Sequence, residues 1–561
     1  MKGLRNHIKK TTPTPKGKVI ATVILLVIVA AAALAIVYWN AIKDQLIHDQ
    51  VKLRVKEKTD RLYRIHYNNM ELDEVSGNLS ISDLSLQYDS VRYLKMKEKK
   101  LAPPVLFKIQ IPYISVTGIQ TPKALLTSEI TGSKIQITYP VIEIFYTQEG
   151  KDSARAVPPG EIYKQILGGL EKIRIDTILI VGARITMRNM RTGKQELHLM
   201  GTHMELWNVS VDSASGRDSS RILFSKQLSA SCSTLLWSSP GQLYTYKAEN
   251  IVMHSSDRKV NAERFRIIPA LSETAFAAKK AIQADWFTAD VKQITFHQIS
   301  FQQLLKKELA VDSMVVQSAS LKIYRDMTMP PDIRSKMGRY PQQQLARIPF
   351  PVGIKKIVLK NTDVEYKEKG RLLQQIGKIT FGNMNAVITN VTNNKAVQDK
   401  VITADIRAKF LNRFPVQTLW TFYLFNTNGR FDIKGHLGTL NAAALNTITE
   451  PLAGTRITGG YIRGLSFNFK GNNYGMDGTV KLLYDDLRIA LLKKDKETKV
   501  LEEKKLRSWG ANMFIKNANP SKNEAPRVAY VHCNREINRS IFHLSWNTLL
   551  EGVKVTALAV K

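Results

Sequence analysis

The chain has 561 residues, of which 44% are hydrophobic, and its formal net charge is +34. This composition excludes an intrinsically disordered chain, and the length suits roughly two to four domains or one elongated domain. The only two cysteines, Cys232 and Cys533, do not have the spacing of a metal site, which leaves open either a disulfide between them or two free thiols.

Residues 19–39, VIATVILLVIVAAAALAIVYW, contain no charged residue. At about 1.5 Å per residue, a helix of this length spans about 30 Å, the thickness of a bilayer core. Basic residues without acids precede this segment and mixed charges follow it, so the positive-inside rule predicts a cytoplasmic N-terminus. A signal peptide cleaved near Ala35 is the alternative, but the apolar run continues to Trp39 and favours an uncleaved anchor. We predict a cytoplasmic tail over 1–18, a transmembrane helix over 19–39, and the rest of the chain outside the cytoplasm.

This topology changes what the basic charge implies. Nearly all lysine and arginine residues follow the predicted span, which argues against nucleic acid as a partner. Anionic lipid headgroups or acidic glycans are the partners expected of a basic surface in a cell envelope, and an evenly charged, solvated surface is the alternative. Residues 40–60 have the charge and apolar spacing of an amphipathic juxtamembrane helix.

From 61 to 430 the sequence consists of short runs typical of β-strands. In VSGNLSISDLSLQYDS, Leu79 and Ile81 alternate with polar residues as in a strand, and the alternation then skips one position before Leu84 and Leu86. Such a slip predicts a bulge that bends the strand and keeps its apolar residues on one face. Helical interruptions are few, and the clearest are at 160–172 and 300–309.

The broken alternation recurs along this region. Three longer segments carry apolar residues at the same offsets: IDTILIVGARITMRN (175–189), VDSMVVQSASLKIYR (311–325) and IKKIVLKNTDVEYKE (354–368). We interpret them as diverged repeats of one β unit. Antiparallel strands of this kind would form an elongated, curved sheet with one apolar face, and the helices are too few to cover that face. The sheet therefore either packs into a closed β-sandwich core or leaves a hydrophobic trough that acyl chains would fill.

We prefer the trough, a repeated β-groove over 61–430 that binds phospholipid or another acyl lipid. In the aligned repeats, Ile178, Met314 and Ile357 should occupy equivalent inward positions. The residues just before them should point outward, and these are Thr177, Ser313 and Lys356. The complete set of predicted lipid-facing residues is Leu79, Ile81, Leu84, Leu86, Ile173, Ile175, Ile178, Ile180, Ile294, Phe296, Met314, Val316, Ile354, Ile357 and Leu359.

The C-terminal part of the sequence suggests a family. A helical run LNAAALNTITEPLAG, a Gly459–Gly460 turn into YIRGLSFNF, an Asn472–Asn473 turn and the run GTVKLLYDDLRIALL follow one another here. This region, 431–561, resembles the C-terminal region of AsmA-like envelope proteins. A single N-terminal span followed by a long β region, with LSISDLSLQY near its start, is also similar to that family.

The resemblance implies a protein anchored in the inner membrane of a diderm bacterium, with a periplasmic β-groove of the bridge-like lipid-transfer type. It implies a role in binding or conducting lipids during outer-membrane biogenesis, with other envelope proteins as partners. It brings no catalytic residues, and the sequence itself has no GxSxG, HExxH, CxxC or P-loop motif, so we expect no enzyme, cofactor or metal. The alternatives are a non-catalytic envelope scaffold with a closed β core and, third, an envelope enzyme. The final helix, 542–550, is apolar enough to cap the groove.

Overall fold

The computed structural model describes residues 59–73, 75–120, 129–146, 171–215, 217–494, 501–503 and 516–557. The predicted cytoplasmic tail and transmembrane helix lie outside these residues, as do almost all of the predicted juxtamembrane helix and of the helix expected at 160–172. Among the residues described, no helix has the length and apolar content that crossing a bilayer requires.

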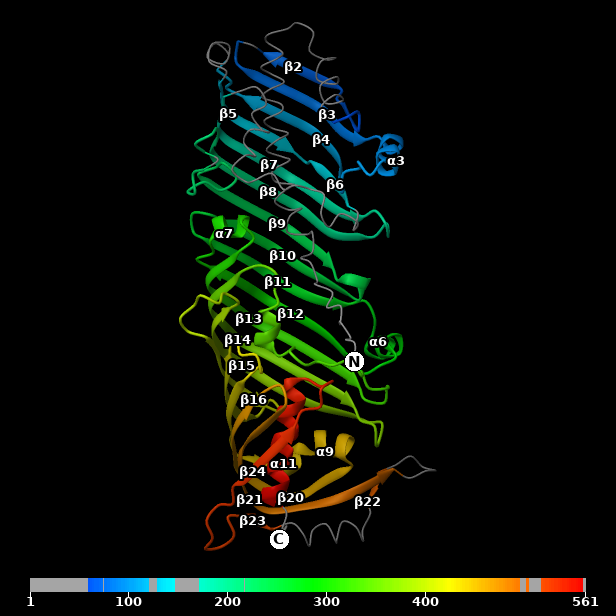
Figure 1. Cartoon of the computed structure of the whole chain (residues 1–561), viewed down its shortest axis with the longest axis vertical. Helices are drawn as coiled ribbons and strands as arrows, with labels where there is room; N and C mark the ends of the chain where they lie inside the picture. The colour runs from blue at the N-terminus through cyan, green and yellow to red at the C-terminus, as the bar shows by residue number, and fades with distance from the viewer. Residues whose placement is uncertain are drawn as a thin grey trace, which may run out of the picture. The chain divides into compact units, whose positions relative to one another are not determined.

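The described chain is mainly β, as predicted, and it divides into two compact units. Unit 1 comprises residues 1–263 and 298–308, and unit 2 comprises 264–297 and 309–561. Strand β11 (Lys259–Pro269) contributes residues to both units. In each unit the strands lie side by side, and most of the helices are short (Figure 1).

Unit 1 contains ten complete strands in a mixed sheet. They are β1 (Tyr63–His66), β2 (Asn69–Asp73), β3 (Asn78–Tyr88), β4 (Val105–Thr117), β5 (Glu129–Thr138), β6 (Val141–Tyr146), β7 (Lys172–Asn189), β8 (Gln195–Val211), β9 (Gln227–Ser238) and β10 (Tyr244–His254). Both β1 and β2 pair with β3, and both β5 and β6 lie between β4 and β7. The helical elements of the unit are α3 (Ser90–Glu98), η2 (Pro240–Gln242) and α7 (Phe301–Leu305).

Unit 2 also contains a mixed sheet. Its strands are β12 (Asp285–His297), β13 (Leu309–Asp326), β14 (Val352–Lys369), β15 (Ile376–Thr392), β16 (Val401–Phe410), β17 (Phe414–Tyr423), β18 (Phe431–Leu437), β19 (Leu440–Asn441), β20 (Thr455–Gly471), β21 (Gly475–Lys494), β22 (Leu501–Glu503), β23 (Ala518–Asn519) and β24 (Ala529–Asn534). Its helical elements are α6 (Glu273–Lys280), α8 (Pro341–Leu345), η3 (Ala442–Leu445), α9 (Asn446–Ala453) and α11 (Ile541–Ala557).

The prediction of a purely antiparallel sheet is wrong. Strand β7 runs parallel to β5 and β6, and β14 runs parallel to β13. Parallel neighbours need a long crossover connection, and the chain between β13 and β14 supplies one over 327–351, where α8 lies. In all three parallel strand pairs, each residue is opposite the residue 43 positions later in the chain, as Ile135 is to Ile178 and Met314 is to Ile357.

The predicted phase slip is confirmed in β3. Asp83, between Ile81 and Leu84, has a φ of 52°, and the buried positions change phase across it. Residues with positive φ also lie at facing positions within or between other strands, and with Asp83 these are Tyr139, Gly182, Gly201 and Asn250 in unit 1 and Ser318, Asn361 and Asn383 in unit 2. We call this set the seam. Register shifts occur at the seam in the pairs β7–β8, β14–β15 and β15–β16, as expected for bulges that bend strands.

The order of elements occurs twice along the chain. β3 and β11 both have 11 residues, β4 and β12 both have 13, β7 and β14 both have 18, and β8 and β15 both have 17. The loop contacts repeat as well: the Ile119 N–H donates to Gly77 O (3.0 Å), and the Ile299 N–H donates to Arg258 O (2.9 Å). We therefore describe residues 63–238 as copy 1 and residues 244–410 as copy 2 of one β unit.

Several local predictions were wrong in detail. The helix expected at 300–309 is the shorter α7, because Leu309 already belongs to β13. Gly459 and Gly460 do not form a turn: β20 runs through them, and Gly460 (φ 117°) lies in a bulge against β21. The turn at Asn472 is confirmed, since its side-chain oxygen accepts a hydrogen bond from the Tyr474 N–H at 2.7 Å between β20 and β21.

Candidate functional site

The predicted lipid-facing residues of unit 1 lie in rows that cross the sheet. Residues directly opposite each other on neighbouring strands share a face, so the register defines each row. One row runs Leu79, Val116, Ile135, Ile178, Leu206 and Leu228. The next runs Ile81, Ile114, Ile137, Ile180, Met204 and Ala230. Ile173 and Ile175 extend the same face along β7, and Leu84 and Leu86 extend it beyond the seam of β3.

Unit 2 has an equivalent apolar face, and we call its longest apolar row the unit 2 row. The row runs Phe296, Met314, Ile357, Ile388, Ala404, Trp420, Ile433 and Phe469. A parallel row on the same face runs Ile294, Val316, Leu359, Ala386 and Ile406. Ile354 also lies on this face, and it is opposite Val311 and Val391.

The residues predicted to point outward lie on the opposite face. Ser313 is directly opposite Lys356, and Lys356 is exposed. Thr177 is opposite Trp207, one position before the apolar row that contains Ile178 and Leu206. The structure therefore places all fifteen predicted residues on the apolar faces of the two units, although nothing in it shows what these faces bind.

Burial differs along the unit 2 row. Phe296, Met314, Ile357 and Ile388 are only half-buried although they lie in the interior of a sheet. We call these four residues the open segment. Ile433 is 1% exposed and belongs to a packed core. In unit 1 the corresponding rows are buried, and Ile178 is 2% exposed.

Helices close the apolar face over β18 to β21. The buried core there contains Tyr340 from the start of α8, Phe431 and Phe469 from the sheet, and Ile541 and Leu544 from α11. The Tyr340 and Phe431 rings meet edge to face, with centroids 5.2 Å apart. The final helix, predicted over 542–550, is the longer α11 and ends at Ala557.

Close approach of α11 to the sheet depends on Gly552. A Cβ atom at Gly552 would lie 2.3 Å from Val480 Cγ2, so no larger residue fits without moving the helix. Thr548 and Thr556 are buried on the same side of α11, and their hydroxyls donate to backbone carbonyls of the helix itself. The contact is therefore made by small side chains whose polar groups are already satisfied.

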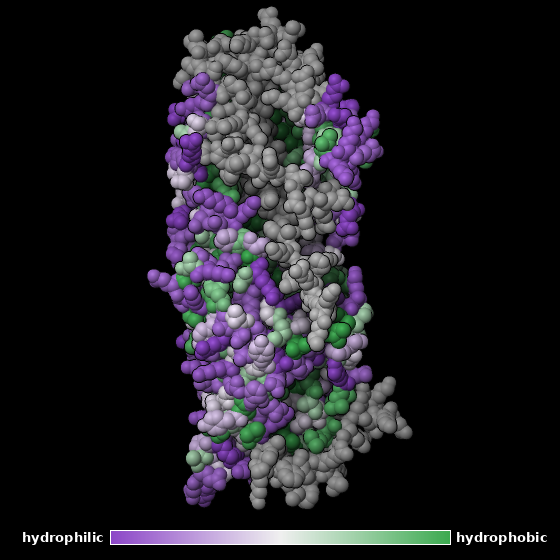
Figure 2. Space-filling view, in the orientation of Figure 1, coloured by the Kyte–Doolittle hydropathy of each residue, from purple (hydrophilic) through white to green (hydrophobic). Residues whose placement is uncertain are grey.

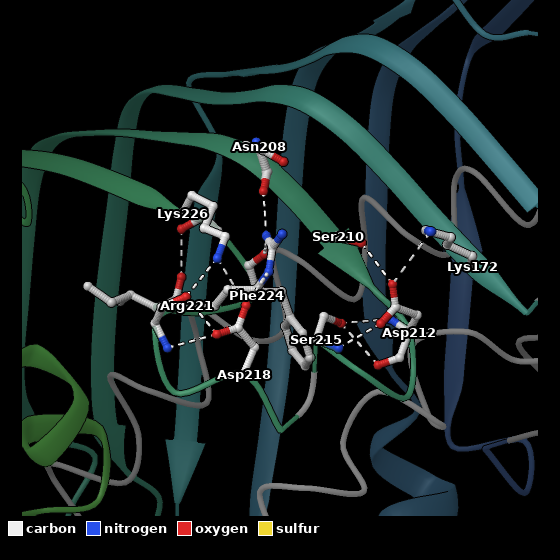
Figure 3. A network of polar contacts seen from close by, with 12 residues as sticks. Lys172, Asn208, Ser210, Asp212, Ser215, Asp218, Arg221, Phe224 and Lys226 are labelled. Atoms are coloured by element: carbon white, nitrogen blue, oxygen red, sulfur yellow. Dashed lines mark hydrogen bonds and ion pairs between the residues drawn. The ribbon is translucent and has the colours of Figure 1, made fainter.

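Two aspartates of unit 1 hold a loop in place through hydrogen bonds. In the β8–β9 connection, Asp212 accepts hydrogen bonds from the Ser215 N–H (2.6 Å) and the Ser210 hydroxyl (2.9 Å), and Lys172 lies 4.0 Å away (Figure 3). Burial alone would raise the pKa of Asp212, but these contacts outweigh it and lower the pKa. Nearby, hydrogen bonds from Ser220 hold the pKa of Asp218 well below its usual range. Both carboxylates stay ionised, and each accepts hydrogen bonds from serines of the same loop region.

A shallow pocket of about 420 Å³ lies between β24 and α11. Its lining residues are His532, Cys533, Asn534, Asn547, Leu550, Glu551 and Lys554. The hydrogen bond from His532 Nδ1 to Asp477 (2.6 Å) raises the pKa of this exposed histidine. In the described part of the chain, no three histidine, cysteine or acidic side chains are grouped so that they could hold a metal ion.

Comparison with known proteins gives no identification: no family model matches the chain, and no curated protein matches it.

Sequence reasoning found the apolar rows but missed how they end. The contacts of Tyr340 and α11 with the sheet join segments far apart in the sequence, and no local pattern reports such a contact. One signal was present for α11: Ser545, Thr548, Gly552 and Thr556 form a stripe of small residues at helical spacing, which is typical of a close helix contact.

Proposed function

We propose that this protein binds or conducts acyl lipids along the apolar faces of its β units, as a non-catalytic component of a bacterial envelope. The observation that carries the proposal is the open segment. Four large apolar side chains, contributed by four successive strands of one sheet, stay half-buried, although burial of each would stabilise the fold by about 1.5–3 kcal/mol. A contiguous apolar surface of this kind usually marks a binding site.

The setting that we propose for this activity is inferred from the sequence. The apolar segment 19–39 and the charge asymmetry around it support a single inner-membrane anchor with the β units in the periplasm. The resemblance of 431–561 to AsmA-like proteins supports the same setting and a role in outer-membrane biogenesis. On this proposal the partners are phospholipid or a related acyl lipid, the inner membrane and other envelope proteins.

A scaffold with a closed β core is the second candidate, and one observation favours it. The rows of unit 1 and the end of the unit 2 row at Ile433 are buried. A scaffold built from such cores would hold no lipid in the open segment, so the two candidates differ in what contacts Met314 and Ile357.

Site-directed photo-crosslinking in cells distinguishes them. A photoreactive amino acid placed at Met314 or Ile357 should capture lipid, because these side chains lie on the apolar face and are half-buried. The matched controls are Ser313 and Lys356, one residue earlier on the same strands and on the opposite face. Mass spectrometry of the crosslinked protein identifies the adducts.

Lipid capture at Met314 and Ile357 without capture at the controls supports lipid binding. Adducts to protein alone at Met314 and Ile357 support the scaffold instead. Equal lipid capture at all four positions would mean non-specific contact with a membrane, and the lipid-binding proposal would then be abandoned.

A further inference from the structure

Helix α11 has two different apolar sides. The side against the sheet carries the small residues described above for Gly552, together with Ile541 and Leu544. A second stripe carries large apolar residues at intervals of three and four: Leu549 and Val553 are partly buried against the core, whereas Phe542 and Trp546 are exposed. Phe542 is 67% exposed, although it is among the largest apolar side chains of the helix. Large apolar residues turned away from the packed side of a helix leave an apolar surface that a ligand or partner can cover.

This second stripe borders the unit 2 row. The ring of Phe542 meets the ring of Trp420 with centroids 5.7 Å apart and an interplanar angle of 60°. Trp420 follows Ala404 in the row and is itself half-buried. Figure 2 shows apolar residues gathered on the visible face around α9 and α11, within a largely hydrophilic surface. The apolar surface of the open segment therefore continues to the beginning of α11.

Cationic side chains gather at the same end of α11. The Arg535 guanidinium donates to Lys336 O (2.7 Å) and Arg539 O (3.5 Å), and the Lys336 N–H donates to Ile537 O (2.7 Å). Arg539 also donates to the side chain of Gln283 at 2.8 Å. These contacts bring Lys336, Arg535 and Arg539 together just before Phe542. We call these three residues the cationic cluster.

The positive charge of the cluster is incompletely matched. Within the part of the chain that the structure describes, Lys336 and Arg535 are in no ion pair. The Nε atoms of Arg535 and Arg539 have no hydrogen-bond acceptor, although these residues are only 8% and 9% exposed. Arg535 stacks over the Tyr340 ring at 4.1 Å, and Arg539 pairs with Glu536 at 3.5 Å, but Lys336 and Arg535 have no carboxylate partner among the described residues. An anionic ligand would supply the missing negative charge.

The neighbouring carboxylates are already engaged. Asp285 pairs with Arg325 at 2.7 Å, and Asp332 pairs with Arg334 at 2.8 Å. Glu536 pairs with Arg539 of the cluster at 3.5 Å, but its side chain is 55% exposed, so solvent screens this pair. Burial, followed by the nearby Arg325, lowers the pKa of Lys336, while Asp285 and Asp332 act in the opposite direction.

We propose that the cationic cluster binds the phosphate of an anionic phospholipid whose acyl chains lie against Trp420, Phe542 and Trp546. This inference rests on the proposed function and adds to it a place for the headgroup. A phosphate group supplies the negative charge and the acceptor oxygens that the cluster lacks. The amino end of a 17-residue helix favours an anion in the same place. The adjoining stripe would contact the acyl chains of the lipid, whereas free phosphate would leave this apolar surface uncovered.

The test measures binding of short-chain lipids to the full-length protein in detergent. The probes are dihexanoyl phosphatidylglycerol, dihexanoylglycerol and inorganic phosphate. The phosphatidylglycerol should bind at least about tenfold more tightly than the dihexanoylglycerol, since one charge-assisted hydrogen bond corresponds to about that factor. Lys336→Gln should remove most of this difference. Lys554→Gln, which changes an exposed lysine of α11 that pairs with Glu551, is the matched control and should change nothing.

The stripe is tested by Phe542→Ala, which should weaken both lipids about equally. Equal affinity for the two lipids, or no effect of Lys336→Gln, would overturn the proposal. Inorganic phosphate that competes as well as the lipid would also overturn it, because the site would then be a phosphate site alone. Arg539→Gln is a second variant, used only where its thermal unfolding matches that of the parent; Lys336 is half-buried, so its variant carries the test independently.

The failure of this inference can be told apart from the failure of the proposed function. Lipid capture at Met314 and Ile357 combined with indifference to Lys336→Gln rejects only the headgroup site. Absence of lipid at those positions rejects both.

Discussion

Gly182 lies so close to the ring of Tyr139 that a Cβ atom built on the glycine would be 2.4 Å from Tyr139 Cδ1. Both residues belong to the seam, with φ values of 67° and 50°. The Tyr139 N–H donates to Val181 O at 2.7 Å, which fixes the two interruptions side by side. The bends of neighbouring strands are therefore coupled through direct contacts at the seam.

We expect Gly182→Ala to lower the free energy of unfolding by about 2–4 kcal/mol, because it adds a clash with Tyr139 to the strain of a left-handed conformation. Gly193→Ala is the control for strain alone: its φ is 65°, and nothing lies within 4 Å of the added Cβ. That variant should cost about 1 kcal/mol. Chemical denaturation of both variants checks the difference, and equal costs would show that the contact with Tyr139 is unimportant.

The two parts of the unit 2 row should respond differently to a buried charge. Ile433→Asp should cost about 3–5 kcal/mol, because Ile433 is 1% exposed within a packed core. Ile357→Asp should cost no more than about 2 kcal/mol, since a half-buried carboxylate can reach water. Denaturation midpoints give the comparison, with Ile433→Val and Ile357→Val as controls for volume. Equal losses for the two aspartate variants would mean that the open segment is closed in solution.

Gly552→Val should displace α11 from β21, since the added side chain would overlap Val480. We expect a loss of about 1–3 kcal/mol and faster proteolysis of the last 20 or so residues, because overpacking at a close contact forces backbone movement. Limited proteolysis followed by mass spectrometry measures this. Lys554→Ala on the exposed side of the same helix should leave the cleavage rate unchanged, and an unchanged rate for Gly552→Val would show that α11 can pack without the close approach.

The pair of His532 and Asp477 should give a measurable pH effect. The hydrogen bond to Asp477 raises the pKa of His532 above its ordinary value. The contact therefore contributes its full stability below the ordinary histidine pKa and loses it as the pH rises through the higher, folded-state value. Asp477→Asn should return the His532 pKa toward its ordinary value. NMR titration of labelled histidine, assigned with His532→Gln, follows the change; an unaltered titration curve in Asp477→Asn would refute the assignment.

The predicted anchor can be tested without structural work. A reporter that is active only outside the cytoplasm, fused after Lys561, should be active, and the mature protein should retain Lys2. N-terminal sequencing provides the second measurement. Cleavage after Ala35 would replace the anchor with a signal peptide while leaving export intact.

The local features of the sheet could be predicted because they depend on short-range patterns. The slip at Asp83 follows from the alternation of Leu79, Ile81, Leu84 and Leu86, since a strand must keep its apolar residues on one face. The alignment of 311–325 with 354–368 placed Met314 and Ile357 on one face correctly, but the two segments are the neighbouring strands β13 and β14 of one copy and not two separate repeats.

Strand direction and closure could not be predicted in this way. The parallel pairing of β13 with β14 is set by how the connection over 327–351 crosses the sheet, and alternation is the same in parallel and antiparallel strands. Gly459 and Gly460 have the composition of a turn, and only their pairing with β21 shows a bulge. The headgroup site proposed above joins Lys336 to Arg535, residues whose proximity no local pattern could reveal.

The parallel pairing with β7 in unit 1 has a consequence for how further copies of the β unit could be added to the chain. From β1 to β10 the strands of unit 1 reverse direction at every pairing except where β5 and β6 pair with β7, so β10 runs in the same direction as β1. Without that exception, β10 would enter with opposite polarity, and a second copy could not repeat the first. Insertion or deletion of one whole copy would therefore leave the direction of every following strand unchanged, so the number of strands in such a sheet can change in steps of one copy.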